Sequence, residues 1–201
     1  FDDAIFHQYE SHPNPVLRPL IGHKFESLLG KAELAICGNR YLQEYASRFC
    51  KRAEIVPTVV DTRVYLPAQA RPDGDPITIG WIGSPSTWRY VRPMVPVLDE
   101  LAETLGLRVR IVGAGPEARA QASPHFELLD WSEEGEISLI QGMDIGIMPL
   151  PDEPWARGKC GYKLIQYMAC GLPTVASPIG VNREIVIDGV TGLQAQDTAE
   201  W

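Results

Sequence analysis

The chain has 201 residues, of which 45% are hydrophobic and 22% charged, a composition typical of a soluble globular protein. Its formal net charge of -8 at pH 7 argues against nonspecific binding to nucleic acid or to an anionic membrane surface. No apolar run approaches the roughly 18 residues of a membrane helix, and no signal peptide is visible. We therefore expect a cytoplasmic protein, and the start at Phe1 rather than at a methionine leads us to expect a fragment.

The cysteines and histidines do not predict a metal site. The four cysteines form no C-x-x-C pair and the four histidines are scattered, so neither set has the spacing of zinc ligands. We interpret the cysteines as reduced thiols. Cys160 and Cys170 are expected to be packing residues rather than nucleophiles, because no histidine is near them in the sequence.

The first part of the chain predicts a few short elements and then a linker. The acidic, aromatic opening FDDAIFHQYESHPNP is typical of a strand end that runs into a loop. Asn39 is a candidate N-cap for the second of two helices. The expected elements, from apolar spacing and turn residues, are a helix over Pro19–Ala32, a strand over Leu34–Cys37, a helix over Tyr41–Cys50, a strand over Glu54–Val60 interrupted by Pro57, and a linker over Leu66–Pro76.

A regular alternation of strands and helices follows. The expected strands are Ile77–Ile82, Leu107–Val112, Phe126–Leu129, Asp144–Met148 and Thr174–Ser177, and the expected helices are Met94–Leu105, Ile137–Gly142, Tyr162–Cys170 and Asn182–Ile187. Short loops rich in glycine and proline join them. This pattern predicts an α/β fold with a Rossmann-like, doubly wound parallel sheet, whose ligand would bind at the carboxyl ends of the strands.

The stretch Met148–Gly180 carries the strongest indication of a phosphate site. A strand ends at Pro149, and a polar loop with Gly158 and Gly161 then leads into a helix. Unpaired backbone N–H groups at a helix start, with a lysine nearby, can bind an anion. Lys159 and Lys163 are the candidate charges, while a plain loop with solvated lysines is the alternative that this pattern leaves open.

The same stretch resembles a known family. LIQYMACGLPTVAS, from Leu164 to Ser177, is similar to the donor-binding signature of the group 1 class of retaining GT-B glycosyltransferases. Pro178-Ile179-Gly180, Glu184 and the segment DGVTG also fit. The resemblance is strong from about Ile77 to Ala195 and weaker from Leu34 to Pro67.

The resemblance implies both an architecture and a reaction. Residues 1–70 would be the tail of an N-terminal acceptor domain with the crossing to the second domain, and residues 71–201 a truncated C-terminal donor domain of a GT-B fold. The intact enzyme would transfer a glycosyl group from a nucleotide diphosphate sugar to a hydroxyl acceptor, such as a sugar or a lipid-linked sugar, with retention and without a metal ion or a cofactor. The fragment alone is expected to bind donor without efficient turnover, because the acceptor wall of the cleft is missing. Docking of the full-length protein at the inner membrane face stays open.

Two positions depart from the family pattern. The family usually carries a Glu-x7-Glu pair, of which the first Glu, near the reacting sugar, would fall at Gly158 and the second, a ribose ligand, at Gln166. An amide can still hydrogen-bond a hydroxyl but carries no charge. Three interpretations follow: the sugar contacts pass to the backbone of Gly158, Lys159, Cys160 and Gly161, with Tyr162 following at the helix start, or the donor differs, or activity is lost. A non-catalytic nucleotide-sugar-binding relative is one alternative, and a nucleotide-sugar epimerase of the same fold is another.

The remaining candidate site residues follow three other strands. In the loop Gly83–Tyr90, Ser84 takes the place of a family arginine, and Arg89 takes the place of a lysine that neutralises the diphosphate. Gly113 and Gly115 belong to a G-x-G-x-x-A motif that the family places near the nucleotide, although alone it suggests a dinucleotide oxidoreductase. Trp131 follows the third strand, where the family holds the base. Arg89 and Lys163 would stabilise the leaving group, with a capping arginine and a rim aromatic as the structural alternatives for Arg89 and Trp131.

Overall fold

The computed structural model describes residues 1–68, 74–121 and 123–201, and it divides into two compact units. The first unit comprises Phe1–Val59, Asp152–Tyr162 and Ile179–Val181. The second comprises Val60–Pro151, Lys163–Pro178 and Asn182–Trp201. The predicted linker Leu66–Pro76 lies partly on residues 69–73, outside the described residues.

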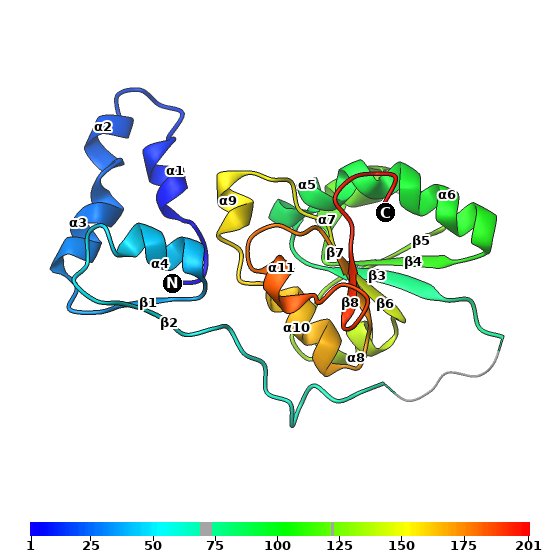
Figure 1. Cartoon of the computed structure of the whole chain (residues 1–201). Helices are drawn as coiled ribbons and strands as arrows, with labels where there is room; N and C mark the ends of the chain where they lie inside the picture. Colours follow the sequence, from blue (N-terminus) through cyan, green and yellow to red (C-terminus); the bar gives the residue numbers. More distant parts are fainter. Residues whose placement is uncertain (69–73, 122) are drawn as a thin grey trace. The chain divides into compact units, whose positions relative to one another are not determined.

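The second unit is built on a six-stranded sheet in which every neighbouring pair is parallel (Figure 1). Its strands, in spatial order, are β5 (Phe126–Leu129), β4 (Arg108–Val112), β3 (Thr78–Ile82), β6 (Ile145–Met148), β7 (Thr174–Ala176) and β8 (Gly192–Gln194). The chain therefore builds outward from β3 to one edge and then returns to β6 to build toward the other edge. This strand order is that of a doubly wound Rossmann-like fold, as the sequence predicts.

Helices cover both faces of this sheet (Figure 1). The connections are η1 (Pro85–Thr87), α5 (Trp88–Val91), η2 (Arg92–Met94), α6 (Val95–Leu105), α7 (Gly115–Gln121), α8 (Glu136–Gln141), α10 (Tyr162–Ala169) and α11 (Asn182–Ile185). On one face, Leu98 of α6 and Ala118 of α7 pack with Val109 and Ile111 of β4 in a buried core. On the other face, the ring of Tyr167 lies against Gly146, where a Cβ would come within 2.4 Å of it.

The strand β3 shows why the middle of the sheet is recognisable in the sequence. All five of its residues are buried, because helices cover it on both sides. A strand in this position can be apolar at every residue instead of alternating with polar ones. Its last amide, that of Ile82, donates to the buried hydroxyl of Tyr167 at 3.0 Å, so α10 is tied to the carboxyl end of β3.

The first unit contains a small parallel pair of strands with helices. Its elements are α1 (Phe6–Glu10), α2 (Arg18–Ile21), α3 (Lys24–Lys31), β1 (Ala35–Cys37), α4 (Arg40–Ala46), β2 (Ala53–Ile55) and α9 (Pro154–Arg157). Asn39 caps α4, since its side chain accepts a hydrogen bond from the amide of Leu42 at 3.0 Å. The rings of Phe6 and Tyr45 stack with centroids 3.5 Å apart and anchor α1 on α4.

Several sequence predictions were wrong in this part of the chain. The opening forms the helix α1, not a strand end and loop, because the buried Phe6 packs on α4. The single helix expected over Pro19–Ala32 is two helices that are separated at Gly22-His23. The strand expected over Glu54–Val60 is limited to β2 and ends before Pro57, which has no N–H to donate to a ladder.

No helix within residues 1–68, 74–121 and 123–201 is long and apolar enough to cross a membrane.

Candidate functional site

The carboxyl edge of the six-stranded sheet is the first place to search for a ligand. The chain leaves β3 toward β4 and later returns to β6 on the other side of β3, so β3 and β6 flank the point where the strand order reverses. Open parallel sheets bind ligands in the crevice outside the carboxyl ends of the strands at such a point. The loops that leave this edge begin at Gly83 after β3, at Gly113 after β4 and at Asp130-Trp131 after β5.

Three of the predicted residues meet at this edge. Gly113 has a φ of 74°, and a Cβ on it would lie 2.3 Å from the carbonyl oxygen of Gly83 and 3.1 Å from Cβ of Trp131. Its amide donates to Leu129 O at 2.9 Å. The loops after β3, β4 and β5 are thus in direct contact, and only a glycine at residue 113 has both the backbone freedom and the small size that this contact requires.

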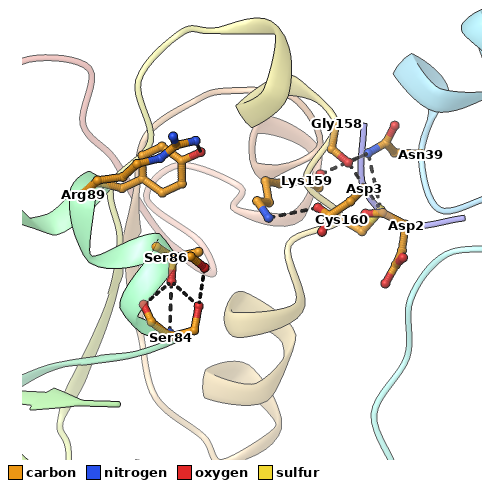
Figure 2. Close-up of polar contacts among 11 residues, drawn as sticks. Asp2, Asp3, Asn39, Ser84, Ser86, Arg89, Gly158, Lys159 and Cys160 are labelled. Atoms are coloured by element: carbon orange, nitrogen blue, oxygen red, sulfur yellow. Dashed lines mark hydrogen bonds and ion pairs between the residues drawn. The ribbon is translucent and has the colours of Figure 1, made fainter. Parts of the chain in front are cut away.

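The loop after β3 is built around a local cap. The Ser84 backbone N–H donates to Thr87 Oγ1 at 3.0 Å, and the Ser84 hydroxyl lies 3.2 Å from the same oxygen and 3.0 Å from Ser86 Oγ (Figure 2). The bond from the Ser84 N–H is one half of a capping box for η1, and the other half joins the Thr87 backbone N–H to the Ser84 side chain. A Cβ on Gly115 would come within 2.8 Å of Pro85, so the loop after β4 also packs on this one. Ser84 therefore has a structural role in shaping the loop.

Arg89 is an exposed residue of α5 whose guanidinium lies over its neighbour Tyr90. The guanidinium carbon Cζ of Arg89 is 4.7 Å from the centroid of the Tyr90 ring, and one guanidinium nitrogen donates to the Tyr90 hydroxyl at 2.6 Å (Figure 2). Guanidinium is a planar cation with five N–H donors, which suits it to bind phosphate oxygens. The contact also restricts the side chain, which lowers the entropy lost when it binds a ligand.

Lys163 lies in the first turn of α10. Its ammonium nitrogen is 5.9 Å from the centroid of the Trp81 ring, a cation–π distance. The same Trp81 ring would meet a Cβ on Gly83 at 2.2 Å. Since both Gly83 and Lys163 lie against Trp81, the structure brings a positive charge to the loop after β3.

A network of four polar side chains extends from the end of β5 to α10. Trp131 Nε1 donates to Glu136 Oε2 at 2.7 Å, and Gln166 Nε2 donates to Glu136 Oε1 at 2.7 Å and to the Tyr65 hydroxyl at 2.9 Å. The Tyr65 hydroxyl in turn donates a short hydrogen bond to Glu136 Oε1. Gln166 is buried, while Trp131 is 48% exposed. Glu136 and Tyr65 are candidate site residues that the sequence analysis did not identify.

The predicted residues of the first unit form a separate group held by Asn39. The amide nitrogen of this buried side chain lies 3.0 Å from both Gly158 O and Lys159 O and 3.5 Å from Cys160 Sγ (Figure 2). The same side chain caps α4 through its oxygen. One asparagine therefore positions the backbone of residues 158–160.

Lys159 and Gly158 have packing partners that restrict their predicted roles. The Lys159 ammonium pairs with an Asp3 carboxylate oxygen at 2.9 Å (Figure 2), and its side chain is only 18% exposed. A Cβ on Gly158 would lie 2.4 Å from Cβ of Ala4, so the unit has no room for a glutamate at this position. Lys159 thus serves the fold, and the departure from the family pattern at Gly158 is built into the packing.

Cys160 and the two residues after it complete this loop. Burial raises the pKa of the Cys160 thiol to about 11, and the thiol donates to Asp2 O at 3.1 Å, as a packing residue would. Gly161 has a φ of 70°, a conformation that favours glycine and turns the chain into α10. Tyr162 is 44% exposed at the start of that helix. Among the described residues, no cluster of three or more histidine, cysteine or acidic side chains could hold a metal ion.

The family profile of the Glycosyl transferases group 1 matches residues 76–201, more than half of the chain. The chain belongs to this family. The resemblance drawn from its sequence is therefore confirmed, and so is the Rossmann-like fold of its matching part.

A curated relative and several solved structures are similar to this member of the family. The D-inositol 3-phosphate glycosyltransferase of Streptosporangium roseum is 29% identical over 124 residues, which are 60% of this chain and 23% of the relative. The Anabaena protein HepE in complex with UDP-glucose has a TM-score of 0.65 at 17% identity, over 84% of this chain and 51% of HepE. The catalytic domain of Arabidopsis thaliana starch synthase IV, bound to ADP and acarbose, has a TM-score of 0.58 at 13% identity, over 83% of this chain and 43% of the starch synthase domain.

This group 1 chain spans about a quarter of the length of the inositol glycosyltransferase and about half of HepE. The structural similarities, all under 25% identity, support the fold.

Proposed function

We propose that this chain binds a nucleotide diphosphate sugar at the carboxyl edge of its six-stranded sheet. The observation that carries the proposal is the meeting of the loops after β3, β4 and β5, where Gly113 contacts Gly83 and Trp131 directly. Glycine loops allow a phosphate to approach the backbone, and the exposed indole of Trp131 offers a flat surface on which a base can stack. HepE with UDP-glucose and starch synthase IV with ADP support a nucleotide ligand for this fold.

The charges near this edge suit a diphosphate. Lys163 lies against Trp81 beside the loop after β3, and Arg89 is exposed on the helix that follows the same loop. Two cations that bind the departing nucleoside diphosphate would stabilise the charge that develops as the glycosidic bond breaks. We therefore propose transfer that needs no metal ion, with Arg89 and Lys163 as the leaving-group stabilisers.

The reaction of the whole protein is proposed from the family. The donor would deliver its glycosyl group to a hydroxyl acceptor, a sugar or a lipid-linked sugar, with retention at the anomeric carbon. Residues 1–70 would belong to an N-terminal acceptor domain and the crossing segment, and residues 71–201 to the donor domain. Because the cleft that excludes water and orients the acceptor needs two complete domains, we expect the 201-residue chain to bind donor but not to turn it over efficiently.

A second candidate is a nucleotide-sugar-binding protein without catalysis. It is favoured by Gly158, where Ala4 occupies the space that a glutamate side chain would need. A longer form of the protein that contains both domains distinguishes the two candidates, since a transferase would release nucleoside diphosphate from its donor when an acceptor is present. Donor binding without any release would support the second candidate.

Calorimetric titration of the chain with UDP, GDP, ADP, dTDP and NADH, without added metal, tests the proposed site. We expect one nucleoside diphosphate to bind more tightly than the others and NADH not to compete with it. Tight binding of NADH would favour a dinucleotide oxidoreductase instead. The absence of binding to any of the four diphosphates would contradict the proposal that this chain carries a donor site.

A further inference from the structure

We propose that Glu136 binds a ribose hydroxyl of the nucleotide and sets the preference of the site for ribonucleotides. The inference rests on the proposed function and names a contact within that site. Glu136 is the first residue of α8 and lies between the exposed Trp131 and the buried Gln166. It is half-buried, so its carboxylate is shaped by the protein yet accessible from solvent.

The two carboxylate oxygens of Glu136 accept different numbers of hydrogen bonds. Oε1 accepts from both Gln166 Nε2 and the Tyr65 hydroxyl, whereas Oε2 accepts from Trp131 Nε1 at 2.7 Å. A carboxylate has about four acceptor positions. Three are filled by these partners, and the remaining one is on Oε2, the oxygen next to the exposed indole.

Gln166 cannot replace Glu136 as the acceptor. Its amide nitrogen faces Glu136 and Tyr65, and an amide oxygen turned toward the carboxylate would be repelled, so the pair has one stable orientation. Gln166 is 2% exposed, which leaves it behind the carboxylate and away from a ligand. Gln166 is therefore a positioning residue for Glu136.

The indole of Trp131 and the carboxylate of Glu136 together match the chemistry of a nucleoside. An indole face stacks on any base, and a carboxylate acceptor beside it suits the hydroxyls of the attached sugar, because hydrogen bonds to a charged acceptor are stronger than those between neutral groups. The Trp131 Nε1 donor holds the indole plane and the carboxylate to each other. A ligand that stacks on Trp131 would thus present its ribose to Oε2 of Glu136.

The test compares ribonucleoside diphosphates with their 2′-deoxy and 3′-deoxy counterparts. Dissociation constants are measured by calorimetry for the wild-type chain and for Glu136→Gln, using the base that binds most tightly, with inorganic pyrophosphate as the probe of the phosphate end. We expect the wild type to prefer the ribonucleotide over at least one deoxy form by about tenfold, the scale of one hydrogen bond to a charged group. In Glu136→Gln that preference should fall to less than about threefold, with pyrophosphate binding retained.

Two further variants keep the test decisive. Glu127→Gln is the matched control, since Glu127 pairs with Arg110 at 2.7 Å and lies outside the network of Trp131, Glu136 and Gln166. It should keep the preference of about tenfold. Glu136→Asp retains the charge for the three donors but withdraws the carboxylate by one carbon. It should also lose the preference, and it replaces Glu136→Gln if that variant does not fold.

The outcomes separate this inference from the proposed function. An unchanged preference in folded Glu136 variants overturns the inference alone, while donor binding itself stands. Equal losses for ribonucleotide, deoxynucleotide and pyrophosphate also overturn it, because they show that Glu136 maintains the site as a whole. A wild-type chain that binds no nucleoside diphosphate overturns both proposals.

Discussion

Replacing Gly113 with alanine tests the packing of the three loops that form the proposed site. Two costs add at this position. The φ of 74° is left-handed, which costs an L-residue about 1–2 kcal/mol. The new Cβ would also lie 2.3 Å from Gly83 O and 3.1 Å from Cβ of Trp131, and forcing atoms into a packed region costs about 1–3 kcal/mol more. We expect Gly113→Ala to lower the free energy of unfolding by about 2–5 kcal/mol.

Gly106→Ala supplies the matched control in the same unit. Gly106 ends α6 with a φ of 65°, and a Cβ on it would meet nothing within 4 Å. Gly106→Ala should therefore lower the free energy of unfolding by the conformational cost alone, about 1–2 kcal/mol. Urea unfolding followed by circular dichroism measures both variants. If Gly113→Ala costs no more than Gly106→Ala, the three loops do not pack as described, and the proposed base and phosphate contacts lose their basis.

Three other predictions concern single side chains. Gly158→Glu restores the residue typical of the family and should lower the free energy of unfolding by about 1–3 kcal/mol, because Ala4 occupies the space that the side chain needs. Thermal or urea unfolding measures this change, and unchanged stability would contradict the described packing of Gly158 on Ala4. Cys160 should react slowly with iodoacetamide at pH 8, where a thiol with a pKa of about 11 is thiolate to the order of one part in a thousand. The rate should rise about tenfold per pH unit, and a rapid, pH-independent reaction would refute the raised pKa of this half-buried thiol. Arg89→Ala and Lys163→Ala should each weaken binding of the preferred nucleoside diphosphate by about 1–3 kcal/mol in calorimetry, and equal affinity would show that the phosphates lie elsewhere.

The sheet of the second unit was predictable because its signals are local. A run such as ITIGWI is apolar at every position and is bounded by turn residues, which is the pattern of a strand covered on both faces. The cap of α4 by Asn39 is likewise a short-range effect that the sequence shows. By contrast, β8 has only three residues, Gly192–Gln194, and its pairing with β7 is what makes it a strand. The equally short β1 and β7 were predicted from their apolar runs, whereas the residues Gly-Leu-Gln of β8 form no such run.

The missed parts of the candidate site depend on contacts between distant residues. In the sequence, Glu136 is one of several acidic residues in a polar stretch, and nothing local distinguishes it from the others. Its partners Tyr65 and Gln166 are 71 and 30 residues away. Lys159 was predicted as a candidate phosphate-binding charge from its place near a helix start, and the sequence did not show that it pairs with Asp3, 156 residues away in the chain. The one available signal was the change from glutamate to Gln166, because an amide, unlike a carboxylate, has N–H donors that can pair with an acceptor such as Glu136.

Hydrogen–deuterium exchange of the chain with and without its tightest nucleoside diphosphate tests the location of the donor site most directly. At short exchange times, we expect slower exchange on binding in residues 83–90, 113–118 and 130–137, which include the loops at the carboxyl edge of the sheet. The helix α6, which lies on a face of the sheet, should be unchanged at those times. Nucleotide binding that leaves these three loops unaffected and protects other segments instead would contradict the claim that the carboxyl edge is the donor site.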